Sequence, residues 1–384
     1  MLPALAAELG VAEVHALAWP EAGRLAADTR TTEALAARGV ALVLHDGHTL
    51  LPPGAVRGAQ DQAFKVYSAF ARAARALGIP GPAPAPARLD WRPAPGEALA
   101  DLAPDMRRGA AVLAAHAPEA GERAALRRLD QFLDRPVQDH ATARDRIDLP
   151  GGTSGLSEAL AVGEIGPRTI WAAARAVPGR GAEKFLSELL WRDFAWALLA
   201  DRPDLPRANY RPDWDRFGWQ GDGPQAEGWR RAMTGIPLVD AGLREMFVTG
   251  TMHNRVRMVV DSFLTKHLLT DWRVGAAWFD DCLTDWDPAS NAMNWQWVAG
   301  SGPDAAPYFR VFNPALQAEK FDPAGAYRRR WLDPASGYFE AGSRAWGLDP
   351  AAPVRPLIGL AEGRARARAA LAAMGSTLAP GHDG

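Results

Sequence analysis

Residues 281–314, DCLTDWDPASNAMNWQWVAGSGPDAAPYFRVFNP, bring tryptophans, aspartates and asparagines together in one short stretch. Folding alone gives no reason for so many large aromatic rings beside carboxylates and amides, because buried polar groups need partners. The paired Asp285 and Asp287 could bind Mg²⁺ or act in general acid–base catalysis. The dense tryptophans and the nearby basic residues instead favour a flat organic cofactor, so no metal site is predicted.

The composition is typical of a soluble globular protein. Of 384 residues, 48% are hydrophobic and 23% are charged, and the formal net charge is −2. This charge gives no general expectation of nucleic-acid binding, so a DNA site would have to be a local basic patch. The single cysteine, Cys282, excludes an internal disulfide and any cysteine-built zinc or iron–sulfur centre.

The sequence also carries no targeting signal that we recognise. No run of about 18 apolar residues is present, so a membrane span is not expected. Residues 1–17 lack the basic region of a signal peptide. Together with the single cysteine, this predicts a protein of the reducing cytoplasm.

The first 77 residues predict an incomplete α/β domain. Short helices alternate there with apolar runs typical of buried parallel strands. The predicted helices are 2–10, 31–39 and 66–78, and the predicted strands are 11–19 and 40–47. Two strands are too few for a complete doubly wound sheet.

The rest of the chain predicts a linker and a large helical domain. Residues 78–98 are rich in proline and glycine, which is typical of an extended linker. From residue 99 to residue 384 the pattern is largely helical. Apolar residues recur at helical spacing in 125–134, 155–165, 167–177, 182–200, 237–250 and 254–269.

A glycine- and serine-rich turn precedes one of these helices, in GGTSGLSEALAVGEIG (151–166). The hydroxyls of Thr153, Ser154 and Ser157 could bind a phosphate together with free backbone N–H groups. The alternative is an ordinary helix cap formed by Ser157 and Glu158. Taken alone, the segment favours the cap, which is the commoner use of such residues.

Two further segments combine charged and apolar side chains. Glu188 and Arg192 lie four residues apart, so they share a helix face and could form a simple surface salt bridge. Trp191 between them offers a flat surface for a planar ligand. In the second segment, Arg255 and Arg257 point to different sides of a helix. One could reach a DNA phosphate while the other pairs with a buried carboxylate, or both could be solvated.

Taken together, these motifs resemble the photolyase/cryptochrome family, and within it most of all a class I-like CPD photolyase. The motifs are TSGLS (153–157), ELLWRDF (188–194), MHNRVRM (252–258), DWDPASNAMNWQW (285–297) and DAAPYFRVFNP (304–314). The resemblance implies a mostly α fold, in which an incomplete Rossmann-like α/β domain precedes an all-helical domain. It also implies FAD, bound non-covalently and folded into a U.

The resemblance implies a set of cofactor contacts. The turn at 153–157 would clamp the FAD pyrophosphate, Arg257 and Asp285 would pair beside the isoalloxazine ring, and Asp287 would accept from its pyrimidine edge. Asn291 would lie near flavin N5, as in the repair enzymes of the family. The whole set is His140, Thr153, Ser154, Gly155, Leu156, Ser157, Arg192, Asn254, Arg257, Asp285, Asp287 and Asn291. The family usually has a tyrosine in place of His140.

A lesion site follows from the same resemblance. Glu188 would hydrogen-bond the damaged bases, and Trp191 and Trp297 would form apolar walls. Asn254 and Met258 would pack on the dimer, and Arg255 would hold its phosphate. The related (6-4) photolyases carry histidines at the positions of Asn254 and Met258, so this chain is expected to repair cyclobutane pyrimidine dimers.

The implied reaction is driven by light. The dimer would be flipped out of the duplex, as photolyases do, and excited reduced FAD would give it an electron that later returns. Trp295, Trp272 and Trp219 match the family's electron-transfer chain, whereas the alternative is that they only fill the core. Trp171, Trp196, Trp229 and Trp346 are predicted to be core or surface residues.

Roughly half of the family's usual N-terminal domain has no counterpart in the sequence. Either the start was assigned late or the protein is natively short. Most of the second-chromophore pocket is absent, which makes a folate or deazaflavin antenna doubtful. We expect a monomer that acts on DNA. The alternatives are a cryptochrome-like photoreceptor, a (6-4) photolyase or an inactive fragment; Asn291 and the short C-terminal tail argue against the photoreceptor.

Overall fold

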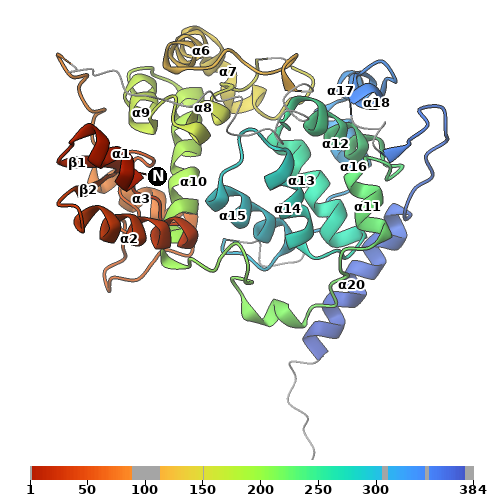
Figure 1. Ribbon diagram of the computed structural model, residues 1–384. Helices are drawn as coiled ribbons and strands as arrows, with labels where there is room; N and C mark the ends of the chain where they lie inside the picture. Colours follow the sequence, from red (N-terminus) through yellow and green to blue (C-terminus); the bar gives the residue numbers. More distant parts are fainter. Residues whose placement is uncertain (1, 89–112, 150, 305–309, 342–345, 377–384) are drawn as a thin grey trace, which may run out of the picture.

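The computed structural model describes residues 2–88, 113–149, 151–304, 310–341 and 346–376. Figure 1 shows the small α/β part in red and orange beside α10 (Arg180–Asp201), with the later helices on the other side. The fold is mostly helical, as predicted. Within the described ranges, no helix is both long and apolar enough to cross a membrane.

The α/β part has the predicted order of elements. They are α1 (Leu2–Leu9), β1 (Glu13–Leu17), α2 (Ala22–Ala36), β2 (Ala41–His45) and α3 (Tyr67–Leu77). The two strands are parallel, with Glu13 opposite Ala41 and Leu17 opposite His45, which confirms the expected pairing. Helix α2 begins nine residues before the predicted residue 31 (31 − 22 = 9). The prediction missed this first part, although RLAADTR consists largely of residues compatible with a helix.

Most of the helical body follows, in the order expected. Its elements are α6 (Glu122–Asp134), α7 (Pro136–Ala143), α8 (Ser157–Val162), α9 (Pro167–Arg175), α10, η2 (Pro212–Arg216), α11 (Pro224–Arg230), α12 (Pro237–Thr249), α13 (Asn254–Ser262), η3 (Phe263–His267), α14 (Trp272–Cys282), α15 (Pro288–Ala299), α16 (Pro314–Phe321), α17 (Ala326–Leu332), α18 (Tyr338–Ala341) and α20 (Leu360–Ser376). The helix predicted for 254–269 changes to a π-helix at Phe263. Residues 78–88 form neither helix nor strand, and the rest of the predicted linker, 89–98, lies outside the described residues.

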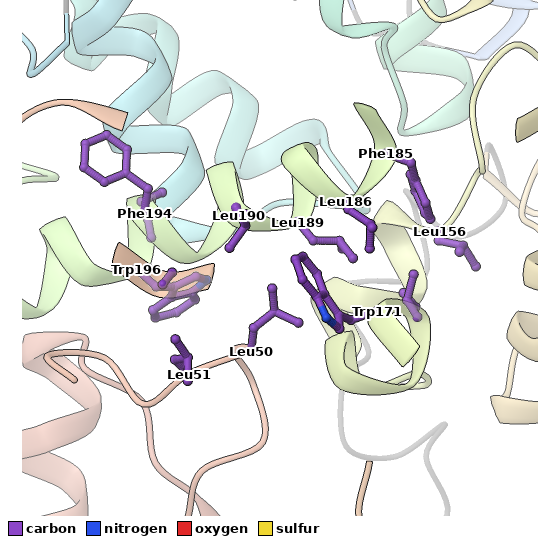
Figure 2. Packing of buried hydrophobic residues seen from close by; sticks show 14 of the residues in the cluster. Leu50, Leu51, Leu156, Trp171, Phe185, Leu186, Leu189, Leu190, Phe194 and Trp196 are labelled. Carbon is purple, nitrogen blue, oxygen red and sulfur yellow. The ribbon is translucent and has the colours of Figure 1, made fainter. Parts of the chain in front are cut away.

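Two large cores hold the body together. One surrounds α10, and Figure 2 shows Leu50 on the side of Leu189 and Leu51 beside Trp196 of that helix. The other lies among α12, α13, α14 and α15 and contains the fully buried Trp272. By contrast, the sheet part has a small core of its own, formed by Ala6, Leu35 and Val40.

The segment after β2 therefore belongs energetically to the helical body. Leu50, Leu51 and Phe70 are buried in the α10 core although they precede residue 77. Apolar burial of this kind contributes about 25 cal/mol per Å². The division into domains at 77 and 98 remains a prediction, but the packing joins residues 48–77 to α10.

A buried carboxylate on α10 fixes this segment. Asp193 accepts hydrogen bonds from the backbone N–H of Leu50 at 3.0 Å and of Leu51 at 3.1 Å. Arg168 donates to the carbonyl of Leu50 at 2.9 Å. Burial raises the pKa of Asp193 to about 6, although the two backbone donors oppose the rise. Asp193 thus supplies the acceptor for two neighbouring backbone N–H groups of the 48–51 segment.

We predict that Asp193→Ala destabilises the protein by about 2–4 kcal/mol, because two buried N–H groups lose their acceptor. Urea unfolding followed by circular dichroism measures this. Asp201→Ala on the same helix is the matched control, since its ion pair with Arg57 (3.0 Å) is partly exposed and should contribute about 1 kcal/mol or less. Equal loss of stability in both variants would contradict the anchoring role of Asp193.

Candidate active site

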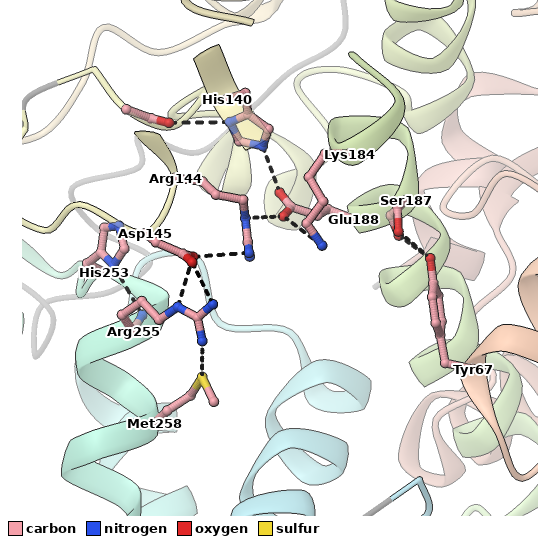
Figure 3. Close-up of polar contacts among 11 residues, drawn as sticks. Tyr67, His140, Arg144, Asp145, Lys184, Ser187, Glu188, His253, Arg255 and Met258 are labelled. Carbon is pink, nitrogen blue, oxygen red and sulfur yellow. Dashed lines mark hydrogen bonds and ion pairs between the residues drawn. The ribbon is translucent and has the colours of Figure 1, made fainter. Parts of the chain in front are cut away.

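A network of charged side chains links α7, α10 and α13. Glu188 of α10 contacts Arg144, which lies 3.2 Å from Asp145, and Asp145 in turn binds Arg255 of α13. Figure 3 shows these contacts as one continuous series that ends at Met258. Of the predicted lesion residues, Glu188, Arg255 and Met258 are therefore connected in space.

Arg255 is held firmly within this network. Its Nε and Nη2 donate to the two oxygens of Asp145 at 2.8 and 2.9 Å, and its Nη1 lies 3.7 Å from the sulfur of Met258. Burial alone would raise the pKa of Asp145, but the hydrogen bond and charge of Arg255 outweigh it and lower that pKa. Such a bidentate pair is strong. A phosphate contact of Arg255 remains a prediction, and the sequence did not identify Asp145 as its partner.

His140 lies behind Glu188. Its Nε2 is 3.1 Å from Glu188 Oε2, and its Nδ1 is 3.3 Å from the carbonyl oxygen of Gly152. The ring is buried edge-on against Phe132 and Phe185. A contact between His140 and the FAD phosphates remains a prediction, because both ring nitrogens here face protein acceptors.

Trp191 is stacked on a residue that the sequence did not single out. The rings of Trp191 and Tyr67 are parallel within 6°, with centroids 3.7 Å apart. The Tyr67 hydroxyl donates to the carbonyl of Ser187 at 2.8 Å. One face of Trp191 is thus covered by α3, so a lesion could use only its other face or edge. No local periodicity pointed to Tyr67, because its partner lies on a distant helix.

Asn254 and Trp297 take different positions. Asn254 is exposed at the first turn of α13, which His253 caps by accepting from the N–H of Arg255 at 3.1 Å. The indole of Trp297 donates to the carbonyl of Asp304 at 3.1 Å and is partly exposed. Both side chains are accessible, and their contact with a dimer remains a prediction.

The expected pair of Arg257 and Asp285 is present. Arg257 Nη2 lies 2.9 Å from each oxygen of Asp285, and its Nε donates to the carbonyl of Met252 at 2.7 Å. The pair joins α13 to the loop before α15. Its geometry was correctly predicted; its place beside a flavin remains a prediction.

Asp287 lies at the centre of a second buried group. Its carboxylate caps α15 by accepting from the N–H of Ser290 at 2.7 Å and accepts from the indole of Trp196 at 2.8 Å. Arg192 and His48 each approach it to 3.7 Å. Burial would raise the pKa of Asp287, but the neighbouring His48 ring and the charge of Arg192 leave it lowered.

Arg192 is bound mainly to the 48–51 segment. Its Nη1 donates to the carbonyl of His48 at 2.5 Å, and Nη2 lies 2.5 Å from Nε2 of the same residue. Trp19 packs on the other side of the His48 ring, with centroids 4.2 Å apart. No local sequence pattern indicated His48. The salt bridge that the spacing of Glu188 and Arg192 suggested is not formed, since Glu188 pairs with Arg144 and Arg192 approaches Asp287. Flavin contacts of Arg192 and Asp287 remain predictions.

The turn at 151–157 does not form the side-chain cap that its sequence favoured. Leu156 is the N-cap of α8 and no side chain caps the helix. Thr153 and Ser157 are exposed and Ser154 is partly exposed. Gly155 has a φ of +62°, which favours glycine. The hydroxyls are therefore not used for capping, which leaves the phosphate role open as a prediction.

The three tryptophans of the predicted electron-transfer chain belong to one packed region. Trp295 and Trp272 are buried and Trp219 packs at the edge of the same core. Gln220 bridges to Thr270, which brings the segment after Trp219 beside the start of α14. Gly275 has no side chain where Trp295 lies against α14, and a Cβ there would collide with the indole. Core packing and electron transfer are both compatible with this arrangement.

Several buried polar atoms in this half of the molecule lack a protein partner. They include the indole N–H groups of Trp286 and Trp295, Oδ1 of Asp261 and Nε2 of His253. Unpaired buried groups cost about 1–3 kcal/mol each. A cofactor with many donors and acceptors, such as FAD, fits a site of this kind. In the described part of the chain, no cluster of His, Cys, Asp or Glu could hold a metal ion.

Two family models match this chain. The FAD-binding domain of DNA photolyase matches residues 185–341, and the DNA photolyase model matches residues 1–88. A deoxyribodipyrimidine photo-lyase of Streptomyces griseus is 39% identical over 373 residues, which cover 94% of this chain and 80% of the relative. The chain belongs to the DNA photolyase family. Its cofactor is FAD.

Other relatives agree. A deoxyribodipyrimidine photo-lyase of Agrobacterium fabrum is 50% identical over 216 residues, which span 55% of this chain and 45% of that relative. A bacterial class III photolyase from Agrobacterium tumefaciens has a similar structure, with a TM-score of 0.82, 36% identity and coverage of 98% and 82% of the two chains. A cryptochrome from Synechocystis also reaches 0.82, at 27% identity and 96% and 81% coverage. The class I-like subtype remains a prediction.

We predict that Asp285→Ala lowers the flavin content of the purified protein and its stability by about 1–3 kcal/mol, because Arg257 loses its partner. The ratio of flavin to protein absorbance and a thermal melt measure the two effects. Asp281→Ala, in the last turn of α14 and exposed, should leave both values unchanged. Full flavin content in Asp285→Ala would show that the pair does not support the cofactor.

Proposed function

We propose that this protein is a light-driven lyase that repairs cyclobutane pyrimidine dimers in DNA. The observation that carries the proposal is the network from Glu188 to Met258. It joins Glu188 of α10, through Arg144 and Asp145, to Arg255 and Met258 of α13, and the family resemblance assigns all three to the lesion. The names of the relatives support the same activity.

The residues of this chain have distinct tasks in the reaction. The Glu188 side chain is 29% exposed, and its carboxylate would accept hydrogen bonds from N–H groups of the flipped-out bases. Trp191, Trp297 and Met258 would enclose the dimer in apolar surroundings and exclude water. Reduced FAD supplies, on excitation by light, the electron that opens the cyclobutane ring.

A photoreceptor is the second candidate, because a cryptochrome shares the fold. The asparagine at position 291 favours repair over signalling. Its amide donates to the carbonyl of Ala276 at 3.1 Å, so the side chain is oriented by α14 and offers an amide, not an acid, at this position. We also propose that the protein acts as a monomer, since one chain carries every residue invoked. The single cysteine is consistent with action in the reducing cytoplasm, which we propose as its location. The flavin is proposed to be the chromophore that absorbs the light.

The test is a repair assay with purified protein, reduced FAD and an oligonucleotide that carries one thymine dimer. Dimer loss under blue light, without loss in the dark, is the expected result. The same illumination of the oligonucleotide without protein controls for direct photochemistry. Unchanged dimer in the presence of bound, photoreducible FAD would refute dimer repair and favour a photoreceptor.

We predict that Trp295→Phe blocks photoreduction of oxidised FAD yet leaves repair by chemically reduced protein intact. Phenylalanine keeps much of the packing against α14 but cannot be oxidised as an indole can. Flavin absorbance under illumination and the repair assay measure the two activities. Trp171→Phe, in the α10 core, is the control and should photoreduce normally. Lost repair in reduced Trp295→Phe would contradict the electron-transfer role.

A further inference from the structure

His140 occupies a position from which it can control Glu188 without touching DNA. Its ring is 2% exposed, whereas the Glu188 side chain is 29% exposed. We propose that His140 is a positioning residue of the repair site, which holds the Glu188 carboxylate ready for the damaged bases. The proposal rests on the proposed function, because Glu188 matters here as a lesion contact.

Both nitrogens of the imidazole face atoms that can only accept. Nδ1 faces the carbonyl oxygen of Gly152 at 3.3 Å, and Nε2 faces the Glu188 carboxylate at 3.1 Å. A proton on Nε2 makes the contact to Glu188 a hydrogen bond in which the imidazole donates. His140 therefore contacts two separate segments at this site, the turn at Gly152 and the carboxylate on α10.

The ring itself has little freedom to move. Phe132 and Phe185 meet it at 90° and 84°, with centroids 5.2 and 5.7 Å away. Helices α7 and α10 also approach closely, since a Cβ on Gly181 would collide with the carbonyl of Val137. Close-packed surroundings of this kind keep a side chain in one rotamer. Because the His140 ring is fixed, its contact with Glu188 restricts the position of that carboxylate.

The second carboxylate oxygen is held from the same side. Arg144 contacts Oε1 of Glu188, and Lys184 Nζ lies 4.0 Å from it. Figure 3 shows these cations grouped around the carboxylate. A carboxylate has about four lone-pair positions, so positions remain for base N–H groups. A side chain that is already ordered loses less freedom on binding, which favours affinity for the lesion.

A purely structural histidine would also be buried and satisfied, so the test must measure coupling to Glu188. The experiment compares wild type, His140→Phe, Glu188→Ala and the double variant, each loaded with FAD. The quantity measured is the ratio of dissociation constants for undamaged and thymine-dimer oligonucleotides. Phenylalanine keeps the aromatic packing and removes both ring nitrogens.

We expect His140→Phe to lower this ratio about tenfold, the usual effect of losing one hydrogen bond to a charged group. The double variant should show the same ratio as Glu188→Ala, because His140 acts only through that carboxylate. His140→Gln, which can still donate to Glu188, should recover part of the loss. It also serves if the phenylalanine variant does not fold.

A buried imidazole elsewhere provides the control. His267 is 1% exposed and stacks on Phe263 in the other core, so His267→Phe should keep the wild-type ratio. An unchanged ratio in His140→Phe, or losses that multiply in the double variant, would overturn the role of His140. So would loss of FAD from His140→Phe with normal lesion preference in the remaining holoprotein, which would favour a phosphate contact instead.

The wild-type protein distinguishes failure of the positioning role from failure of the proposed function. A wild type that repairs dimers beside an unaltered His140→Phe rejects only the positioning role. A wild type that neither prefers dimer DNA nor repairs it in light rejects the proposed function, and the role of His140 with it.

Discussion

The arrangement of the site depends on consecutive charged residues of α10. Arg192 and Asp193 bind the same N-terminal segment in different ways. The guanidinium donates to the carbonyl of His48, and the carboxylate accepts from the N–H groups of Leu50 and Leu51. Arg192 also approaches Asp287, which caps α15. Buried charges are tolerated only when they are paired and hydrogen-bonded. This requirement fixes the N-terminal segment, α10 and the start of α15 relative to one another.

Beside this group of charges, residues of the proposed site lie on two different cores. Glu188 and Trp191 lie one turn or less from Arg192 on α10, and they belong to the side that packs with α3 and α7. The Arg257–Asp285 pair and Trp295 lie in the core of α12 to α15. The bridge from Arg144 through Asp145 to Arg255 joins the two sides. Electron transfer between a cofactor and a lesion depends on how the two are positioned. A fixed distance between the two sides therefore favours the reaction.

Periodicity and motifs predicted much of this arrangement. The parallel strands and the six helical segments that apolar spacing indicated are present, and Arg257 pairs with Asp285 as expected. What the sequence could not supply were contacts between distant segments. His48 and Tyr67 belong to a part that looked like a separate domain, yet they bind Arg192 and Trp191. A local pattern shows which face is apolar, but it does not show which distant segment covers that face.

In the proposed reaction, light moves an electron from reduced flavin to a dimer held by this site. The most direct measurement is the excited-state lifetime of the reduced flavin in the purified protein, with dimer-containing or undamaged oligonucleotide at saturation. We expect the dimer to shorten the lifetime, because electron transfer competes with emission, and undamaged DNA to leave it unchanged. Equal lifetimes with both oligonucleotides, while both are bound, would refute electron transfer to the dimer.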